Sequence, residues 1–250
     1  SLGITGSRWC GFENFEYLFL NSDFWFAVRN TLLISLYQVI FCFPFPVILA
    51  LFLNEIRLAR YKKFVQTVYT FPHFLSWVLI SGIVMNLLSS SGAVNSLMMA
   101  LGGEKHQFLT DKALFRSILV FFLAWKESGW NCILYLASIT AIDPSLYGAN
   151  RWHRTRYITW PGISMIVVVT LILRIGSMMD VGFDQVINLY NASVYDVGDI
   201  IDTYVYRITF QRAGNFGVST AVGLFKGVTN CILLLSANGI CRLLGEEGIV

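Results

Sequence analysis

Residues 30–53 read NTLLISLYQVIFCFPFPVILALFL, and no charged side chain lies between Arg29 and Glu55. An α-helix rises about 1.5 Å per residue, so this stretch is long enough to cross a hydrocarbon layer roughly 30 Å thick. Pro44 and Pro46 lie within it. Prolines are tolerated in spanning helices where neighbouring groups satisfy the freed carbonyls. The stretch therefore predicts a membrane-spanning helix.

Further long apolar segments follow the first. Of the 250 residues, 56% are hydrophobic and 13% are charged, whereas about 25% of residues are charged in soluble domains. The mean hydropathy of +0.62 indicates the same preference for lipid. We therefore expect an all-α, polytopic membrane helix bundle of about five spans. The remaining spans are expected at residues 64–88, 114–142, 158–179 and 218–237.

Arg and Lys are dense in two alternate loops, residues 54–63 and 143–157. Short loops rich in these residues stay in the cytoplasm. The two loops and the tail, which carries Arg242, are therefore predicted to be cytoplasmic. The segments predicted to lie outside are 1–29, 89–113 and 180–217.

The N-terminal segment is expected outside although neither a signal peptide nor an initiator Met precedes it. The simplest explanation is that a preceding span has been removed. Phe12, Phe15 and Phe19 share one helical face, which predicts an amphipathic interfacial element, although an ordinary packed loop explains them equally well. The expected organisation is an outer amphipathic segment at 1–29, a transmembrane domain at 30–241 and a cytoplasmic tail at 242–250.

Four charged residues lie well within predicted spans: Lys126, Glu127, Arg174 and Lys226. A charge at the centre of a bilayer is costly, so such residues face protein or a water-filled cavity. Neighbours in sequence do not face each other on a helix, so Lys126 and Glu127 are each expected to find a partner elsewhere. One interpretation is a polar translocation pathway formed by Lys126, Glu127 and Trp130, with more aromatic residues nearby. The other is structural pairing, for example of Glu127 with Arg174 or Lys226.

The sequence offers no catalytic, metal or nucleotide site. Its three histidines are predicted on different sides of the membrane, and its five cysteines show no zinc spacing. A GxxxxGK[ST] phosphate loop is absent. The net charge of +3 does not suggest nucleic-acid binding. We expect a chain with no cofactor, no metal and no enzyme activity of its own.

The loop after the third predicted span has the most specific pattern. It reads IDPSLYGANRW over residues 142–152 and then ITWPGI over residues 158–163. It resembles the signature loop of binding-protein-dependent ABC importer permeases, where DPxLYEAA is followed by GAxRW and ITLPGI. Further segments resemble the carbohydrate-uptake (maltose-type) branch, and within it the lipoprotein-associated polysaccharide permeases of Gram-positive bacteria. These segments are Asn14-Phe15, Asn30-Thr31-Leu32, 125–130, 196–207 and 221–226.

The resemblance implies a type I importer permease fold in which residues 142–163 form coupling helices that dock on a cytoplasmic ATPase. A glycine permits the bend between these helices because it accepts left-handed backbone angles, and Pro161 matches the proline that opens the next span. The residues that it implies for ATPase contact are Asp143, Pro144, Gly148, Ala149, Arg151 and Trp152.

One departure from the family pattern lies in this loop. Tyr147 is followed directly by Gly148, so the E-A-A stretch is missing. Each helical residue contributes about 100° of turn, so a deletion rotates everything beyond it. We expect docking on the ATPase to be impaired or rearranged.

The family implies the permease subunit of an ATP-driven oligosaccharide importer, multi-pass in the plasma membrane of a bacterium. The implied partners are ATPase subunits, a second permease subunit, an extracellular sugar-binding lipoprotein, the oligosaccharide and membrane lipid. Residues 180–217 are expected to meet the binding protein or the sugar, or simply to cap the bundle. The alternative functions are a self-contained secondary transporter of a small polar solute, which predicts internal repeats, and a membrane-embedded enzyme. Neither repeats nor gathered catalytic groups are evident.

Overall fold

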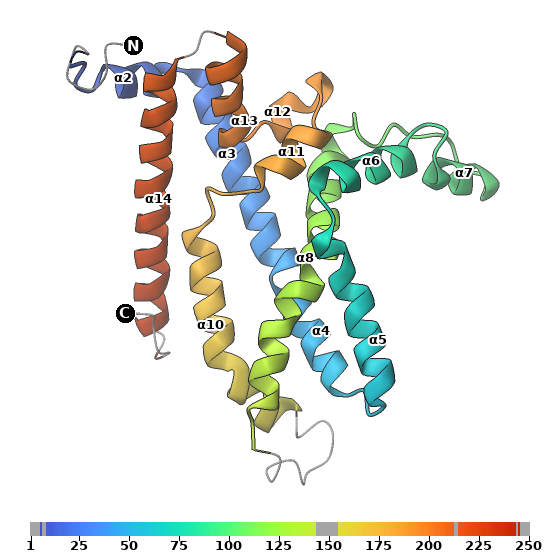
Figure 1. The fold of residues 1–250 in the computed structure, drawn as a ribbon. Helices are drawn as coiled ribbons and strands as arrows, with labels where there is room; N and C mark the ends of the chain where they lie inside the picture. The colour runs from blue at the N-terminus through green and yellow to red at the C-terminus, as the bar shows by residue number, and fades with distance from the viewer. Residues whose placement is uncertain (1–5, 7–8, 144–154, 213–214, 244, 246–250) are drawn as a thin grey trace.

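The computed structural model describes residues 6, 9–143, 155–212, 215–243 and 245. Within these residues the chain forms helices and no strand. Long helices run side by side, and shorter helices gather at the end of the bundle that holds the N-terminus (Figure 1). This outer end lies opposite the end that leads into residues 144–154. The all-α helix bundle is therefore confirmed.

The first span begins earlier than predicted. Helix α3 (Ser22–Tyr37) starts at Ser22, so Asn30 lies within the helix and does not open it. A π-helical turn, η1 (Gln38–Cys42), connects α3 to α4 (Pro44–Asn54). In this turn the N–H of Phe43 donates to the carbonyl of Gln38 at 3.1 Å. Because proline lacks an N–H, the helical ladder changes register just before Pro44.

The second predicted span, residues 64–88, is wrong as one continuous helix. Helix α5 (Ala59–Thr70) runs along the bundle and passes into a short 3₁₀ turn, η2 (Phe71–Phe74). Helix α6 (Trp77–Leu88) then begins after extended backbone at Leu75 and, with α7 (Ala93–Ala100), lies across the outer end (Figure 1). Proline removes a helical hydrogen bond, and Pro72 lies at the break. Hydropathy does not report this change of direction.

Helix α8 (Lys112–Thr140) lies at the centre of the bundle and contacts α4, α5 and α10. Its 29 residues extend over about 43 Å. After residues 144–154, a π-helical turn, η4 (Thr155–Thr159), leads into α10 (Trp160–Gly176), and Pro161 lies in the first turn of α10 as predicted. Helix α14 (Phe216–Leu243) packs along α10.

Among the described residues, four helical stretches are long and apolar enough to cross a membrane. Helix α8 is not among them, although it runs the length of the bundle (Figure 1). Charged residues within α8, including Lys126 and Glu127, lower its hydropathy. One of the four stretches consists of α6 and α7 and lies across the outer end. The four stretches are Ser22–Asn54, Trp77–Ala100, Thr155–Gly176 and Phe216–Leu243.

The segments predicted to lie outside fold into short helices that close the outer end of the bundle. One buried cluster joins Leu18 of α2, Phe24 of α3 and Tyr204 of α13, and another joins α6, α8 and α11. A third cluster packs α4, α8 and α10 at the other end. The short outer helices are α2 (Glu13–Leu20), α11 (Phe183–Leu189), η5 (Ala192–Val194), α12 (Tyr195–Gly198), α13 (Ile201–Tyr206) and η6 (Arg207–Arg212).

Candidate functional site

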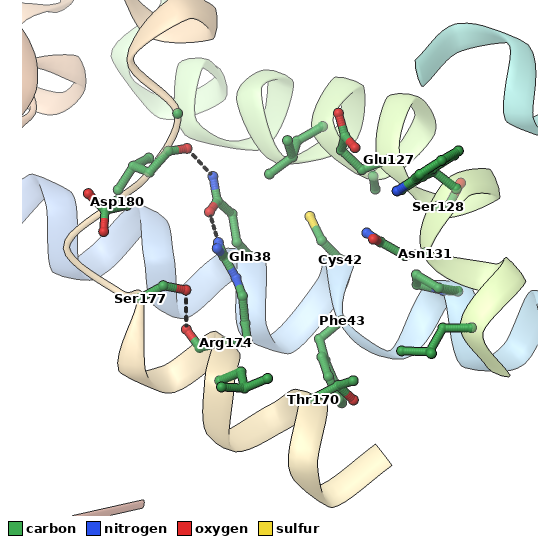
Figure 2. Close-up of a pocket in the computed structure, with 18 of the residues that line it drawn as sticks. Gln38, Cys42, Phe43, Glu127, Ser128, Asn131, Thr170, Arg174, Ser177 and Asp180 are labelled. Atoms are coloured by element: carbon green, nitrogen blue, oxygen red, sulfur yellow. Dashed lines mark hydrogen bonds between the residues drawn. The ribbon is translucent and has the colours of Figure 1, made fainter. Parts of the chain in front are cut away.

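A cavity of about 560 Å³ opens beside the centre of the bundle, between the α3–α4 span, α8 and α10. Figure 2 shows polar side chains entering it from all three sides. Its volume lies within the range of small-molecule sites, and its wall mixes apolar with hydrogen-bonding groups. The polar side chains of the lining are Gln38, Glu127, Ser128, Asn131, Tyr135, Thr170, Arg174, Ser177 and Asp180.

The three residues predicted for a pathway separate into two groups. Glu127 and Trp130 line the cavity, whereas Lys126 does not. The Lys126 side chain is 5% exposed, and its Nζ donates to the carbonyl of His73 at 2.6 Å and to that of Pro72 at 3.4 Å. Lys126 therefore holds the broken end of α5–η2 against α8.

Lys126 and Glu127 each have a partner elsewhere, as expected, but the expectation that they do not face each other is wrong. Lys126 Nζ lies 3.4 Å from Glu127 Oε1. Both side chains are long enough to turn toward η2, where each finds a second partner. Helical spacing describes the direction of the Cβ atoms and does not limit where the ends of long side chains meet.

His73 contacts two residues of the cavity wall, and sequence reasoning missed it. Its Nδ1 lies 2.8 Å from Glu127 Oε2, and its ring stacks on Trp130 with 4.6 Å between centroids and 4° between planes. Glu127 thus pairs with His73 and Lys126, and the suggested pairs with Arg174 or Lys226 are not formed. The only signal in the sequence was the adjacent Pro72, which marks the break that turns His73 toward α8.

The other two charged residues predicted well within spans, Lys226 and Arg174, have different surroundings. Lys226 of α14 lies 2.8 Å from Asp180 Oδ1 and 2.5 Å from Asp202 Oδ1, and so ties α14 to the outer segment. Arg174, near the end of α10, donates from Nη2 to the side-chain oxygen of Gln38. Gln38 in turn donates to the carbonyl of Val181 at 3.1 Å. Figure 2 shows this chain of contacts along one wall of the cavity.

Gly129 lies in α8 between the cavity residues Glu127 and Trp130 and helps to position both. A Cβ at this position would lie 2.0 Å from the carbonyl oxygen of Tyr69. Helix α8 therefore approaches the backbone of α5 at a distance that only a glycine at position 129 allows. The close approach brings Glu127 and Trp130 within reach of His73.

Comparison with known proteins identifies the family. No family model matches the chain. It is 43% identical over 255 residues to the polygalacturonan/rhamnogalacturonan transport system permease protein YteP of Bacillus subtilis, covering 99% of this chain and 79% of that protein. It is 42% identical to the LplB protein of the same organism, with 99% and 80% covered. The chain belongs to the permeases of carbohydrate-uptake ABC importers.

Solved structures agree with this family and not with the alternative of a secondary transporter. The permease superposes with a TM-score of 0.90 on a chain of a bacterial alginate ABC transporter in complex with an alginate pentasaccharide-bound periplasmic protein, at 38% identity over 99% of this chain and 88% of that one. A second structure, of an ABC transporter that imports the acidic polysaccharide alginate, gives a TM-score of 0.89 at 39% identity over 94% of this chain and 85% of that one. The protein is therefore a multi-pass bacterial membrane permease for sugar import, and such permease subunits are not enzymes themselves.

The residues predicted for ATPase coupling lie mostly outside the described part of the permease. Asp143 is described and exposed, and it lies three residues beyond Thr140, where α8 ends. The coupling residues Pro144, Gly148, Ala149, Arg151 and Trp152 fall within residues 144–154, outside the described ranges. Beyond them, a Cβ on Gly162 would lie 2.6 Å from the side chain of Ile142, so the two ends of the loop meet closely.

Among the described residues, no group of three or more His, Cys, Asp or Glu side chains is arranged to hold a metal ion. The cavity instead offers hydrogen-bond donors and acceptors together with an exposed indole ring at Trp130. These groups suit reversible binding of a hydroxyl-rich ligand.

Proposed function

We propose that the cavity between the α3–α4 span, α8 and α10 is the path by which this permease moves an oligosaccharide across the membrane. The observation that carries the proposal is the cavity of about 560 Å³ lined by Asn131, Thr170, Glu127 and Trp130. The chain that forms it is 43% identical to a polygalacturonan/rhamnogalacturonan transport system permease protein. Amide and hydroxyl groups bind sugar hydroxyls. An indole face packs against the apolar face of a sugar ring.

The transport cycle depends on partners. We infer that an extracellular sugar-binding lipoprotein delivers the oligosaccharide to the outer helices and that a second, different permease subunit completes the cavity. A cytoplasmic ATPase hydrolyses the ATP. The periplasmic protein in the alginate transporter structure supports this arrangement. The permease itself contributes two conformations, and ATP binding shifts the population between them through differential contacts at the coupling loop.

The coupling loop, residues 142–163, is proposed to transmit this shift through Asp143, Pro144, Gly148, Ala149, Arg151 and Trp152. The missing E-A-A stretch is proposed to weaken ATPase docking. The test compares substrate-stimulated ATPase activity of the importer with and without the restored stretch between Tyr147 and Gly148. We expect higher stimulation with the stretch restored, and equal stimulation would contradict the proposal.

The path is tested by uptake into proteoliposomes that contain the complete importer and its binding protein. Trp130→Ala removes the indole in the cavity, and we expect a KM for oligosaccharide that rises at least about tenfold. Trp125→Ala is the matched control, because Trp125 lies on the same helix but lines a different groove. An unchanged KM for Trp130→Ala, or an equal rise for both variants, would contradict this path.

A further inference from the structure

The charged side chains around the cavity differ in whether they have a direct partner of opposite charge. Two carboxylates and one guanidinium line it: Glu127, Asp180 and Arg174. Each carboxylate has a cation in direct contact: Lys126 lies 3.4 Å from Glu127, and Lys226 lies 2.8 Å from Asp180 and is shared with Asp202 at 2.5 Å. His73 and Asn230 add hydrogen-bonding contacts to these carboxylates, each at 2.8–2.9 Å.

Arg174 differs from these groups. Among the residues that the structure describes, no carboxylate lies within ion-pair distance of its guanidinium. Its contact is the neutral side-chain oxygen of Gln38. Gln38 is 1% exposed and is itself held by the carbonyl of Val181. A buried amide therefore fixes the position of the guanidinium without neutralising its charge.

The position of Arg174 makes the lack of a directly contacting carboxylate among the described residues informative. The residue is half-buried on a spanning helix, where ionised side chains are costly and are usually kept for a function. A guanidinium has five N–H donors, and its planar fork matches the two oxygens of a carboxylate. Arg174 lines a cavity that also holds neutral hydrogen-bonding side chains.

Resting on the proposed path, we propose that Arg174 binds a carboxylate of the cargo and that the cargo is an oligosaccharide of uronic acids. Asn131 and Thr170 then contact hydroxyls of the same sugar from the neighbouring walls of the cavity (Figure 2). A cargo carboxylate gives Arg174 the direct ion pair that no described side chain supplies, so a neutral sugar gains less from entering. The names of two similar systems, one for polygalacturonan and one for the acidic polysaccharide alginate, agree with this chemistry.

The test uses the complete importer with its binding protein in proteoliposomes and two probes: trigalacturonate and the same trisaccharide with its carboxylates methyl-esterified. The KM for uptake of each probe is measured for wild type, Arg174→Gln and Arg174→Lys. The same binding protein delivers the cargo in every sample, so its own preference cancels from the variant-to-wild-type ratio. Thr170→Val is the matched control, since it removes a polar group from the cavity without a change of charge.

We expect Arg174→Gln to raise the KM for trigalacturonate at least about tenfold and that for the ester less than about twofold. Arg174→Lys keeps the preference for the charged probe with weaker affinity, because it keeps the charge and loses the fork. Thr170→Val changes both ratios equally. If the Arg174→Gln importer does not assemble, the variant-to-wild-type KM ratios of Arg174→Lys for the two probes test the proposal.

Three results would overturn parts of the account in distinguishable ways. Equal changes for both probes in the Arg174 variants would show that Arg174 only supports the structure. Wild-type uptake is also compared between trigalacturonate, trimannuronate, the ester and a neutral trisaccharide. A preference for the ester or the neutral trisaccharide would contradict a uronic-acid cargo and would leave the proposed path unaffected. Failure of wild type to import any of these oligosaccharides would overturn the proposed function itself.

Discussion

Replacement of Lys126 by Met tests how the broken span is held in place. Lys126 reaches from α8 to the end of η2, where its Nζ donates to the carbonyl of His73 at 2.6 Å and lies 5.6 Å from the Trp77 ring centroid. The C-terminal end of a helix exposes carbonyls without intrahelical partners. A cation at this end also interacts favourably with the negative end of the helix dipole. Met has a similar length and no charge, so the substitution removes these interactions with little change in packed volume.

The expected cost follows from these contacts. A buried carbonyl left without a donor costs about 1–3 kcal/mol. Removal of one partner from a buried ion pair costs up to about 3–5 kcal/mol. Glu127 keeps His73 as a partner at 2.8 Å, so the second contribution is reduced. We therefore expect a loss of about 3 kcal/mol, which lowers the melting midpoint by roughly 6–12 °C for a chain of this length.

The assay is thermal unfolding of the purified permease in nanodiscs at one scan rate. Lys112→Met is the control, because Lys112 lies on the same helix with an exposed side chain, and we expect its midpoint to match wild type. Lys126→Met with Glu127→Gln separates the two contributions. The double variant is expected to recover less than half of the loss, since the His73 carbonyl stays without a donor. A Lys126→Met midpoint equal to wild type would refute the reasoning.

Three further predictions concern packing, a buried ion pair and topology. Gly129→Ala forces α8 away from α5, and we expect a lower melting midpoint, whereas Gly223→Ala, which meets nothing within 4 Å, serves as the control and leaves the midpoint unchanged or slightly higher. Asp199→Asn weakens the ion pair in which Arg207 Nη2 lies 2.6 Å from Asp199 Oδ2. We expect the free energy of unfolding to fall by about 3–5 kcal/mol in the same assay, and an unchanged midpoint would contradict a structural role. A cysteine at position 143 of a cysteine-free variant is expected to react with impermeant maleimide only from the cytoplasmic side, and labelling of intact cells would overturn the topology.

Much of the fold could be predicted from local patterns along the chain. Apolar length located the spans that contain α3–α4, α8, α10 and α14, because lipid exposure of a helix depends on its own side chains. The Lys126-Glu127 pair was found as well, since charges inside a span are rare. The direction of the chain after Pro72 could not be predicted, because the apolar residues of α6 suit either a spanning helix or one buried across the outer end.

The sequence by itself determined that this protein is a helical membrane permease and identified Glu127 and Trp130 as candidates for its path. Only the tertiary structure decided that Lys126 supports a broken helix, that His73 pairs with Glu127, and that Arg174 faces the cavity without a carboxylate partner among the described residues. The physical reason is that entry into lipid depends on the sum of local side-chain hydrophobicities. The partner of a charge instead depends on which helices approach one another, and here residues more than fifty positions apart meet, such as Gln38 and Arg174, which are separated by 136 positions.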